Sequence, residues 1–144
     1  MSYLLDTCTL SMLRKQVTPN IRRWFESKNQ DLFFISCVTL AELWDGIERL
    51  SPSRKKRDLE DWFHGDVMTR FKDRTLPIDN LIALEWGSLS ATLQKKGVTI
   101  GVQDLYIAAT AKSKGLAIIT LNVKDFKNLD IPIINPWEVQ KSIV

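Results

Sequence analysis

Four acidic residues, far apart in the chain, each stand where a short apolar run gives way to a segment with helical periodicity. They are Asp6, Glu42, Asp104 and Asp125. Ionised carboxylates are costly to place against apolar segments unless something pairs with them. In an open α/β sheet, ligand sites form outside the carboxyl ends of the strands, so these side chains can converge there. Four converging carboxylates repel one another and call for a hard cation. The pattern therefore favours a magnesium-dependent phosphodiesterase.

Each of these acids also has a purely structural interpretation. Thr39 and Glu42 have the spacing of a helix capping box, in which Glu42 would accept a hydrogen bond from the backbone N–H of Thr39. Asp6 and Asp104 could each cap the helix that follows, and Asp125 could belong to a turn. A carboxylate has two oxygens with about four lone-pair directions, so capping and metal ligation do not exclude each other.

The surroundings of Asp6 and Asp104 favour a site over a cap. Asp6 directly follows an apolar run, and Thr7 would be an adequate cap without it. Asp104 precedes residues 105–111, a nearly uncharged segment whose alanines would let its helix pack closely on the sheet. Such packing would hold the carboxylate rigidly at the rim of the sheet, as a metal site requires.

Other catalytic chemistries lack the residues that they need. The single histidine, His64, lies in an amphipathic stretch, and the chain has neither a G-x-S-x-G elbow nor a G-x-x-x-x-G-K-[ST] loop. An aspartyl-phosphate phosphatase would carry a second acid two residues after the first, where Cys8 stands. Cys8 and Cys37 have no C-x-x-C spacing, so neither a structural zinc nor a disulfide framework is expected.

The composition is that of one ordinary globular domain, residues 1–144, with 44% hydrophobic and 26% charged residues. No apolar stretch approaches the roughly 20 residues of a membrane span, and no secretory signal begins the chain, so a cytoplasmic protein is expected. The net charge of +3 and the basic run at residues 54–57 favour approach to polyanions. A solvated surface explains that run equally well.

Strand-like and helix-like segments alternate along the chain. Strands are predicted at residues 3–5, 32–37, 74–78, 117–120 and 132–135. Amphipathic helices are predicted from apolar stripes over residues 40–47, 59–71, 82–93 and 107–111. We expect Asp79 and Gly97 to bound the third of these helices and Gly115 to end the fourth. Short parallel strands joined by helices predict a three-layer α/β/α fold with a mainly parallel central sheet.

The four acids lie in motifs that occur together in one known family. Residues 5–11 read LDTCTLS, residues 35–43 ISCVTLAEL, residues 104–111 DLYIAATA and residues 120–126 TLNVKDF, and NPW follows at 135–137. In this order they resemble the L-D-T-N-x-x-S, I-S-x-V-T-x-x-E-L, D-x-x-I-A-A-T-A and T-x-N-x-x-D-F motifs of PIN-domain ribonucleases of the VapC toxin type. The resemblance spans essentially the whole chain.

The resemblance implies a PIN-like fold and metal-dependent endonucleolytic cleavage of RNA that leaves a 5′-phosphate. Asp6 and Asp104 would ligate Mg²⁺, with Mn²⁺ as an alternative, and Asp125 would complete the acidic pocket. Glu42 would ligate a second ion or orient the attacking water. Asn122 would be a neutral or water-mediated ligand beside Asp125.

Four polar residues would support these acids: Thr7, Ser11, Thr120 and Asn122. Cys8 departs from the family pattern, which has asparagine at this position. A thiol is a poorer hydrogen-bonding group than an amide, so the surroundings of the first acid differ from the pattern here.

The resemblance also implies partners. A toxin of this type pairs with a cognate antitoxin, whose segment would lie in a groove with the helices around residues 40–50 and 59–71 as walls. Homodimers are the habit of the family. Two alternatives stand beside the ribonuclease. One is a catalytically weak PIN-fold protein that binds RNA or a partner, and the other is a structure-specific DNA nuclease. A chain of 144 residues leaves little room for the extra helical arch expected in such a DNA nuclease.

Overall fold

Five short strands form one sheet in the computed structural model, which describes residues 1–15 and 17–138. The strands are β1 (Tyr3–Leu5), β2 (Phe33–Ser36), β3 (Thr75–Leu76), β4 (Ala117–Ile119) and β5 (Ile133–Ile134). Their order is β3-β2-β1-β4-β5, and every neighbouring pair is parallel. Each strand lies within its predicted range.

The central strands are apolar on both faces because both faces are covered by helices. Successive side chains of a strand point to opposite faces. Leu4 and Ile118 accordingly belong to one hydrophobic cluster, whereas Leu5 and Ile119 belong to a second. All four are almost completely buried. A parallel sheet with two cores of this kind is the middle layer of a three-layer fold.

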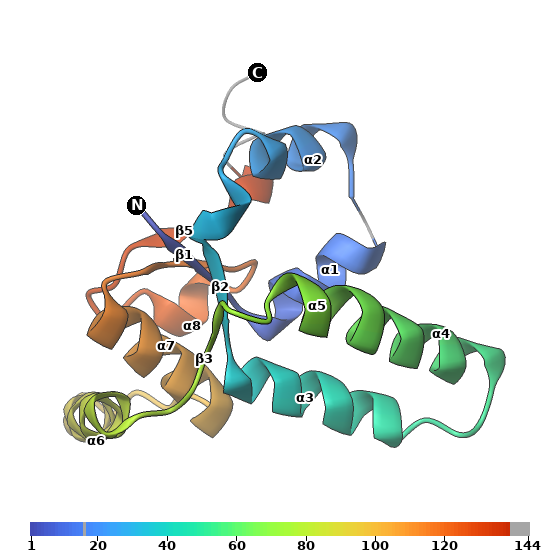
Figure 1. The fold of residues 1–144 in the computed structure, drawn as a ribbon. Helices are drawn as coiled ribbons and strands as arrows, with labels where there is room; N and C mark the ends of the chain where they lie inside the picture. The colour runs from blue at the N-terminus through green and yellow to red at the C-terminus, as the bar shows by residue number, and fades with distance from the viewer. Residues whose placement is uncertain (16, 139–144) are drawn as a thin grey trace.

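A helical hairpin covers the first face. It consists of α6 (Asn80–Lys95) and α7 (Val102–Lys114), which lie on the left of the sheet in Figure 1. The alanines of α7 at 108, 109 and 111 are fully buried, which is the close packing on the sheet expected from the sequence. The short helix α8 (Val123–Phe126) follows β4 and contributes Phe126 to the same core.

The other face carries α1 (Thr7–Lys15), α3 (Cys37–Glu48), α4 (Arg54–Trp62) and α5 (Met68–Arg70). A π-helical segment, Phe63–Val67, joins α4 to α5. Helices α3 and α4 pack against each other and extend together away from the sheet (Figure 1). Helix α2 (Pro19–Glu26) lies apart from this pair, above α1 in the same view, and a 3₁₀ turn, Gln30–Leu32, leads from it to β2.

The predicted three-layer α/β/α architecture is therefore confirmed. Within the described ranges, none of the helices combines the length and the apolar character that a membrane crossing needs. The predicted domain extends to residue 144, and residues 139–144 lie outside the part of the chain that the structure describes.

Several helix boundaries follow the sequence signals. Asp79 accepts a hydrogen bond from the backbone N–H of Ile82 at 2.8 Å and so caps α6. Gly97 and Gly115 follow α6 and α7 with φ of 69° and 67°, a left-handed conformation that favours glycine.

Two capping predictions are wrong. Helix α3 begins at Cys37, and Ser36 caps it by accepting a hydrogen bond from the N–H of Val38 at 3.1 Å. Thr39 therefore lies inside the first turn and forms no capping box with Glu42. Helix α7 begins after Gly101, so Asp104 is inside its first turn and not at its cap.

Candidate active site

The sheet positions the acids at its carboxyl edge, beside its central strands. The strand order reverses between β1 and β4, and this is where ligand sites form in open α/β sheets. Asp6 directly follows β1. The helices that connect parallel strands run antiparallel to the strands and therefore begin at the carboxyl edge. Helix α3, which follows a strand, and helix α7, which leads into one, both begin there. Glu42 on α3 and Asp104 on α7 are brought to the edge in this way.

Asp6 is buried and firmly held. Its Oδ1 accepts a hydrogen bond from the backbone N–H of Thr9 at 2.8 Å, and its Oδ2 accepts one from Thr120 Oγ1 at 2.5 Å. The first bond is the helix cap that the sequence predicted for α1. The second ties β1 to the end of β4, and it places Thr120, one of the residues predicted to support the acids, beside Asp6. Thr7 lies inside α1 and is not a cap.

Glu42 is oriented by a residue from a different helix. Its Oε1 accepts a hydrogen bond from Thr7 Oγ1 at 2.8 Å, and Thr7 Oγ1 lies 3.1 Å from the hydroxyl of Thr39. Thr39 is fully buried. Thr7, which was predicted to support the acids, therefore contacts Glu42 directly. Thr39 is not among the residues predicted from the sequence, where its spacing from Glu42 also matches a capping box.

Asp104 is half-buried and is affected by the charges of the other three acids. Burial, together with the negative charges of Asp125, Glu42 and Asp6, raises the pKa of its carboxyl to about 6. Both effects disfavour the ionised form, because water is removed and like charges are near. The charge of each of the other three acids is thus felt at Asp104, although the four residues are distant in the sequence.

Asp125 and its neighbours form the exposed side of the cluster. Asp125 lies on α8, where its backbone N–H donates to Asn122 O at 3.0 Å. The Asn122 backbone N–H donates to Thr120 Oγ1 at 2.9 Å, and its side-chain amide donates to Cys8 Sγ at 3.6 Å. Partial burial of the sulfur, followed by the charge of Asp6, raises the pKa of the Cys8 thiol above its ordinary value. The thiol therefore stays protonated at neutral pH and accepts the amide proton.

A groove of about 300 Å³ extends from Glu42 between α1, α3 and α4. Its walls are mainly apolar, with Leu50 and Trp62 among the residues that form them. Thr7 and Ser11 line it on the α1 side. Ser11 therefore shares a groove with Glu42, but no hydrogen bond that the structure describes joins it to a carboxylate.

A larger hollow lies elsewhere. It has a volume of about 540 Å³ and lies between α1, α2 and β2, with Phe25, Phe33 and Phe71 in its lining. None of the four acids lines it. The largest of these hollows is therefore not the place where the four acids converge.

The model of the PIN domain family matches residues 3–132. The chain belongs to the PIN domain family. The Toxin FitB of Neisseria gonorrhoeae is 32% identical over 135 residues, which are 93% of this chain and 97% of that protein. The tRNA(fMet)-specific endonuclease VapC of Salmonella typhimurium is 31% identical over 138 residues, 95% of this chain and 98% of that protein.

The structural comparison agrees. The crystal structure of FitAcB from Neisseria gonorrhoeae superposes with a TM-score of 0.85 and 32% identity, covering 94% of this chain and 98% of that chain. The structural neighbours include VapBC and FitAB complexes of toxin–antitoxin systems. The resemblance inferred from the motifs is therefore confirmed, and so is the expected PIN-like fold.

The PIN domain brings its four acids together without building a closed metal cage. Within residues 1–15 and 17–138, no three or more His, Cys, Asp and Glu side chains are arranged to hold one ion together. The charges nevertheless act on one another at Asp104. The two findings are compatible, because like charges interact over distances at which their oxygens cannot share one inner coordination sphere.

Proposed function

We propose that this PIN domain is a magnesium-dependent endoribonuclease, with Mn²⁺ as an alternative ion, and the toxin of a toxin–antitoxin pair. The observation that carries the proposal is the half-buried Asp104, whose pKa is raised to about 6 by burial and by three other acids at the carboxyl edge of the sheet. Such a cluster gains most from a hard divalent cation. Relatives named as ribonucleases support RNA as the substrate.

The donor set fits magnesium better than a metal that needs a full set of protein ligands. The acids supply hard oxygen atoms. Magnesium usually keeps several of its waters and takes one or two carboxylates directly, so it does not require three side chains in contact with one ion. Asp6 and Asp104 would hold it, and Asp125 would complete the pocket.

The chain's own residues have separate tasks in this proposal. Asp6 is fixed by Thr9 and Thr120, so its remaining lone pairs point in defined directions. Glu42, held by Thr7, would orient the attacking water or hold a second ion. The bound cation would lower the pKa of a water molecule and stabilise the charge that develops at phosphorus. Cleavage would leave a 5′-phosphate, and action on RNA would place the protein in the cytoplasm.

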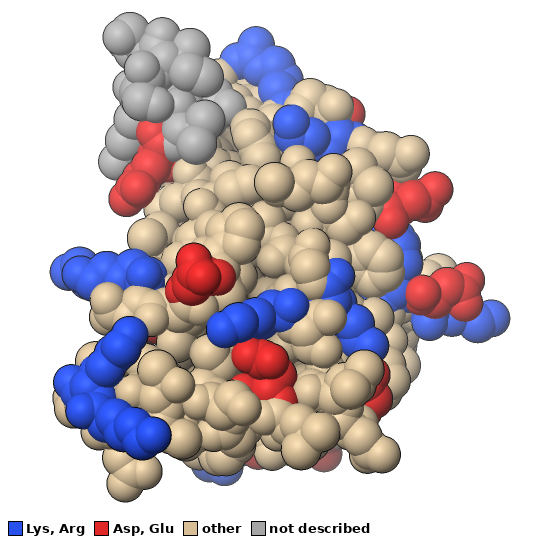
Figure 2. Space-filling view, turned by 90° about the vertical axis from the view of Figure 1, so that its left-hand side faces the viewer, with Lys and Arg blue, Asp and Glu red and all other residues tan. Residues whose placement is uncertain are grey.

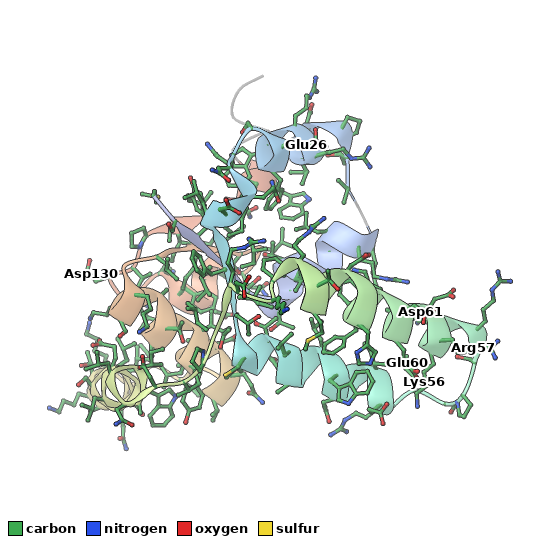
Figure 3. All side chains as sticks on the ribbon, in the orientation of Figure 1. Glu26, Lys56, Arg57, Glu60, Asp61 and Asp130 are labelled. Atoms are coloured by element: carbon green, nitrogen blue, oxygen red, sulfur yellow. The ribbon has the colours of Figure 1, made fainter. Side chains whose placement is uncertain are left out.

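The surface charges suggest where RNA would approach. On the face that carries α6 and α7, basic and acidic side chains are interspersed (Figure 2). The groove beside Glu42 is different, because Arg14, Lys15 and Lys55 line it. Of the basic run at 54–57, Lys55 lines the groove, while Lys56 and Arg57 lie toward the outer end of α4 (Figure 3). Cations beside the acids would attract the phosphates next to the cleaved bond.

The test compares cleavage of a structured RNA by the wild-type protein and by Asp104→Asn, with Mg²⁺ or Mn²⁺ present. We expect the variant to lose activity by at least about 100-fold, as is typical when a metal-binding carboxylate or its support is removed. Asp130→Asn is the matched control. Asp130 is exposed, lies on the opposite side of the sheet from α3 and α4 (Figure 3), and has φ of 55°, which asparagine also adopts readily.

Each alternative has its own outcome in this experiment. Equal cleavage by wild type and Asp104→Asn would show that the pocket is assigned wrongly, and equal cleavage in excess EDTA would exclude metal catalysis. Binding of RNA without cleavage in either ion would favour the catalytically weak binding protein. Cleavage of branched DNA but not of RNA would favour the DNA nuclease.

An antitoxin partner is part of the same proposal. The groove between α1, α3 and α4 has apolar walls and ends at Glu42, so a helical segment lying in it would cover the approach to the acids. Structural neighbours that are toxin–antitoxin complexes support such a partner. We also expect a homodimer, and sedimentation of the purified protein would measure that state.

A further inference from the structure

Two hydroxyl groups link the protein interior to the Glu42 carboxylate. Thr39 Oγ1 lies 3.1 Å from Thr7 Oγ1, which lies 2.8 Å from Glu42 Oε1. Thr39 is fully buried, Thr7 is half-buried, and Glu42 reaches the groove. Thr39 and Glu42 are on α3, and Thr7 is on α1, so the series also joins two helices.

The direction of these hydrogen bonds follows from the protons available. An ionised carboxylate can only accept, and a threonine hydroxyl has one proton to donate. Thr7 must therefore give its proton to Glu42, and it accepts the proton of Thr39 with a lone pair. Hydrogen bonds in such a series polarise one another, so the bond from Thr39 strengthens the bond that reaches Glu42.

Within residues 1–15 and 17–138, the hydroxyl of Thr39 forms no hydrogen bond to a backbone carbonyl. A threonine inside a helix commonly donates to the carbonyl four residues earlier, as Thr110 does to Tyr106 in α7 at 2.7 Å. Four residues before Thr39 is Ile35, which belongs to β2 and not to the helix. Among the described residues, the hydrogen-bond partner of the Thr39 hydroxyl is Thr7.

The series matters because a glutamate side chain is flexible. Glutamate loses considerable rotamer freedom when it is held in one orientation. The two threonines are β-branched and stiff at χ1, and one of them is fixed in the core. A stiff, buried hydroxyl can therefore define the position of a carboxylate that would otherwise move in the groove.

We propose that Thr39 is a positioning residue, whose buried hydroxyl holds the Glu42 carboxylate through Thr7 in the orientation that the metal-dependent site uses. The inference rests on the proposed function, since it concerns the part that Glu42 takes in that site. Thr39 contacts neither RNA nor metal and acts only through the carboxylate.

The test measures Mn²⁺ binding to the RNA-free protein by calorimetry, together with RNA cleavage. Thr39→Val removes the hydroxyl with little change of shape. We expect about tenfold weaker Mn²⁺ binding and about tenfold slower cleavage, the lower end of the range for residues that orient metal ligands. Thr39→Ser keeps a hydroxyl and should recover most of both losses. Thr110→Val is the matched control, because Thr110 is equally buried but donates within its own helix.

The same substitution made in a Glu42→Gln protein tests whether Thr39 acts through Glu42. In Glu42→Gln, the further change Thr39→Val should alter Mn²⁺ affinity and cleavage by less than about twofold, because two residues that act through one group are not additive. Thr7→Val, at a half-buried position, should reproduce the loss seen in Thr39→Val. If melting curves show that Thr39→Val does not fold, the Thr7→Val variant tests the positioning role in its place.

Three results would overturn the inference. One is a folded Thr39→Val protein, or a Thr7→Val protein, that binds Mn²⁺ and cuts RNA like wild type. Another is an equal loss in the Glu42→Gln background, which would mean that Thr39 acts elsewhere. The third is a wild-type protein that neither binds Mn²⁺ nor cuts RNA, which would remove the proposed function and this inference with it. The first two leave the proposed function intact.

Discussion

Asp6 has both carboxylate oxygens engaged within the protein, and its charge still reaches Asp104. One oxygen caps α1 through Thr9, and the other accepts from Thr120. Each oxygen keeps a further lone-pair direction. The same residue can therefore begin a helix and belong to an acidic site. Glu42 differs, because Ser36 caps its helix and leaves its carboxylate to Thr7.

The pKa of Asp104 predicts an unusual effect of pH on stability. Its pKa in the folded protein, about 6, is above the ordinary 3.8, so the folded state binds this proton more tightly than the unfolded chain. The stabilisation from this proton is complete below pH 3.8 and is lost as the pH rises through about 6. Asp104→Asn should therefore gain stability relative to wild type as the pH rises from 4 to 7.5.

Urea unfolding in EDTA at several pH values measures this difference. The pKa shift alone would correspond to about 3 kcal/mol, and solvent at this half-buried carboxyl reduces the expected gain to about 1 kcal/mol. Asp130→Asn, at an exposed position, controls for the general effect of replacing an aspartate by asparagine. A stability difference for Asp104→Asn that does not change with pH would contradict the raised pKa of Asp104, which arises from burial and from the charges of the other three acids.

The helices bring three of the acids to the edge of the sheet, and their main features follow from sequence patterns. The apolar stripes locate α3, α6 and α7, and Asp79 and Gly115 mark boundaries as expected. Helices α2 and α8 were not predicted, because neither is long enough to show a full apolar stripe. The stripe over residues 59–71 is interrupted by the π-helical segment, which periodicity alone does not reveal.

The left-handed residue at the end of α7 should be needed for stability but not for cleavage. Gly115 has φ of 67°, and its N–H donates to Ala111 O. Gly115→Ala should lower the free energy of unfolding by about 1 kcal/mol and the melting temperature by about 3 °C. Calorimetric melting measures both.

Gly87→Ala is the opposite control. Gly87 lies inside α6, where an added Cβ meets open space, so alanine should raise the free energy of unfolding by about 0.5–1 kcal/mol. Specific RNA cleavage should be unchanged in both variants. An alanine at 115 that leaves the melting temperature unaltered would argue against the left-handed cap.

At the scale of the whole molecule, the strand order decides what the acids can do. With β1 and β4 adjacent in the centre, residues 6 and 120 meet across a separation of 114 positions. The same arrangement leaves α3 and α4 extending to one side of the sheet (Figure 1). The apolar groove lies between these two helices and α1. The site and the proposed antitoxin groove are thus continuous.

A change in the groove far from Glu42 should separate antitoxin binding from catalysis. Leu50→Lys places a charge on the apolar wall, so we expect at least tenfold weaker binding of the antitoxin, since an unpaired charge at an interface is costly. Cleavage should stay within about twofold of wild type. Co-purification with the cognate antitoxin measures binding. Leu81→Lys, on the exposed face of α6, is the control.

The sequence by itself determined the strands, most helices, the family and the identity of the four acids, because apolar periodicity and motif residues are local properties of the chain. Only the tertiary structure decided how those acids are held. Thr120 meets Asp6, and Thr39 reaches Glu42 through Thr7, because parallel pairing and helix packing bring distant segments together. Spacing suggested a capping box for Thr39 and Glu42, and the start of α3 at Cys37 replaced it with a contact between helices.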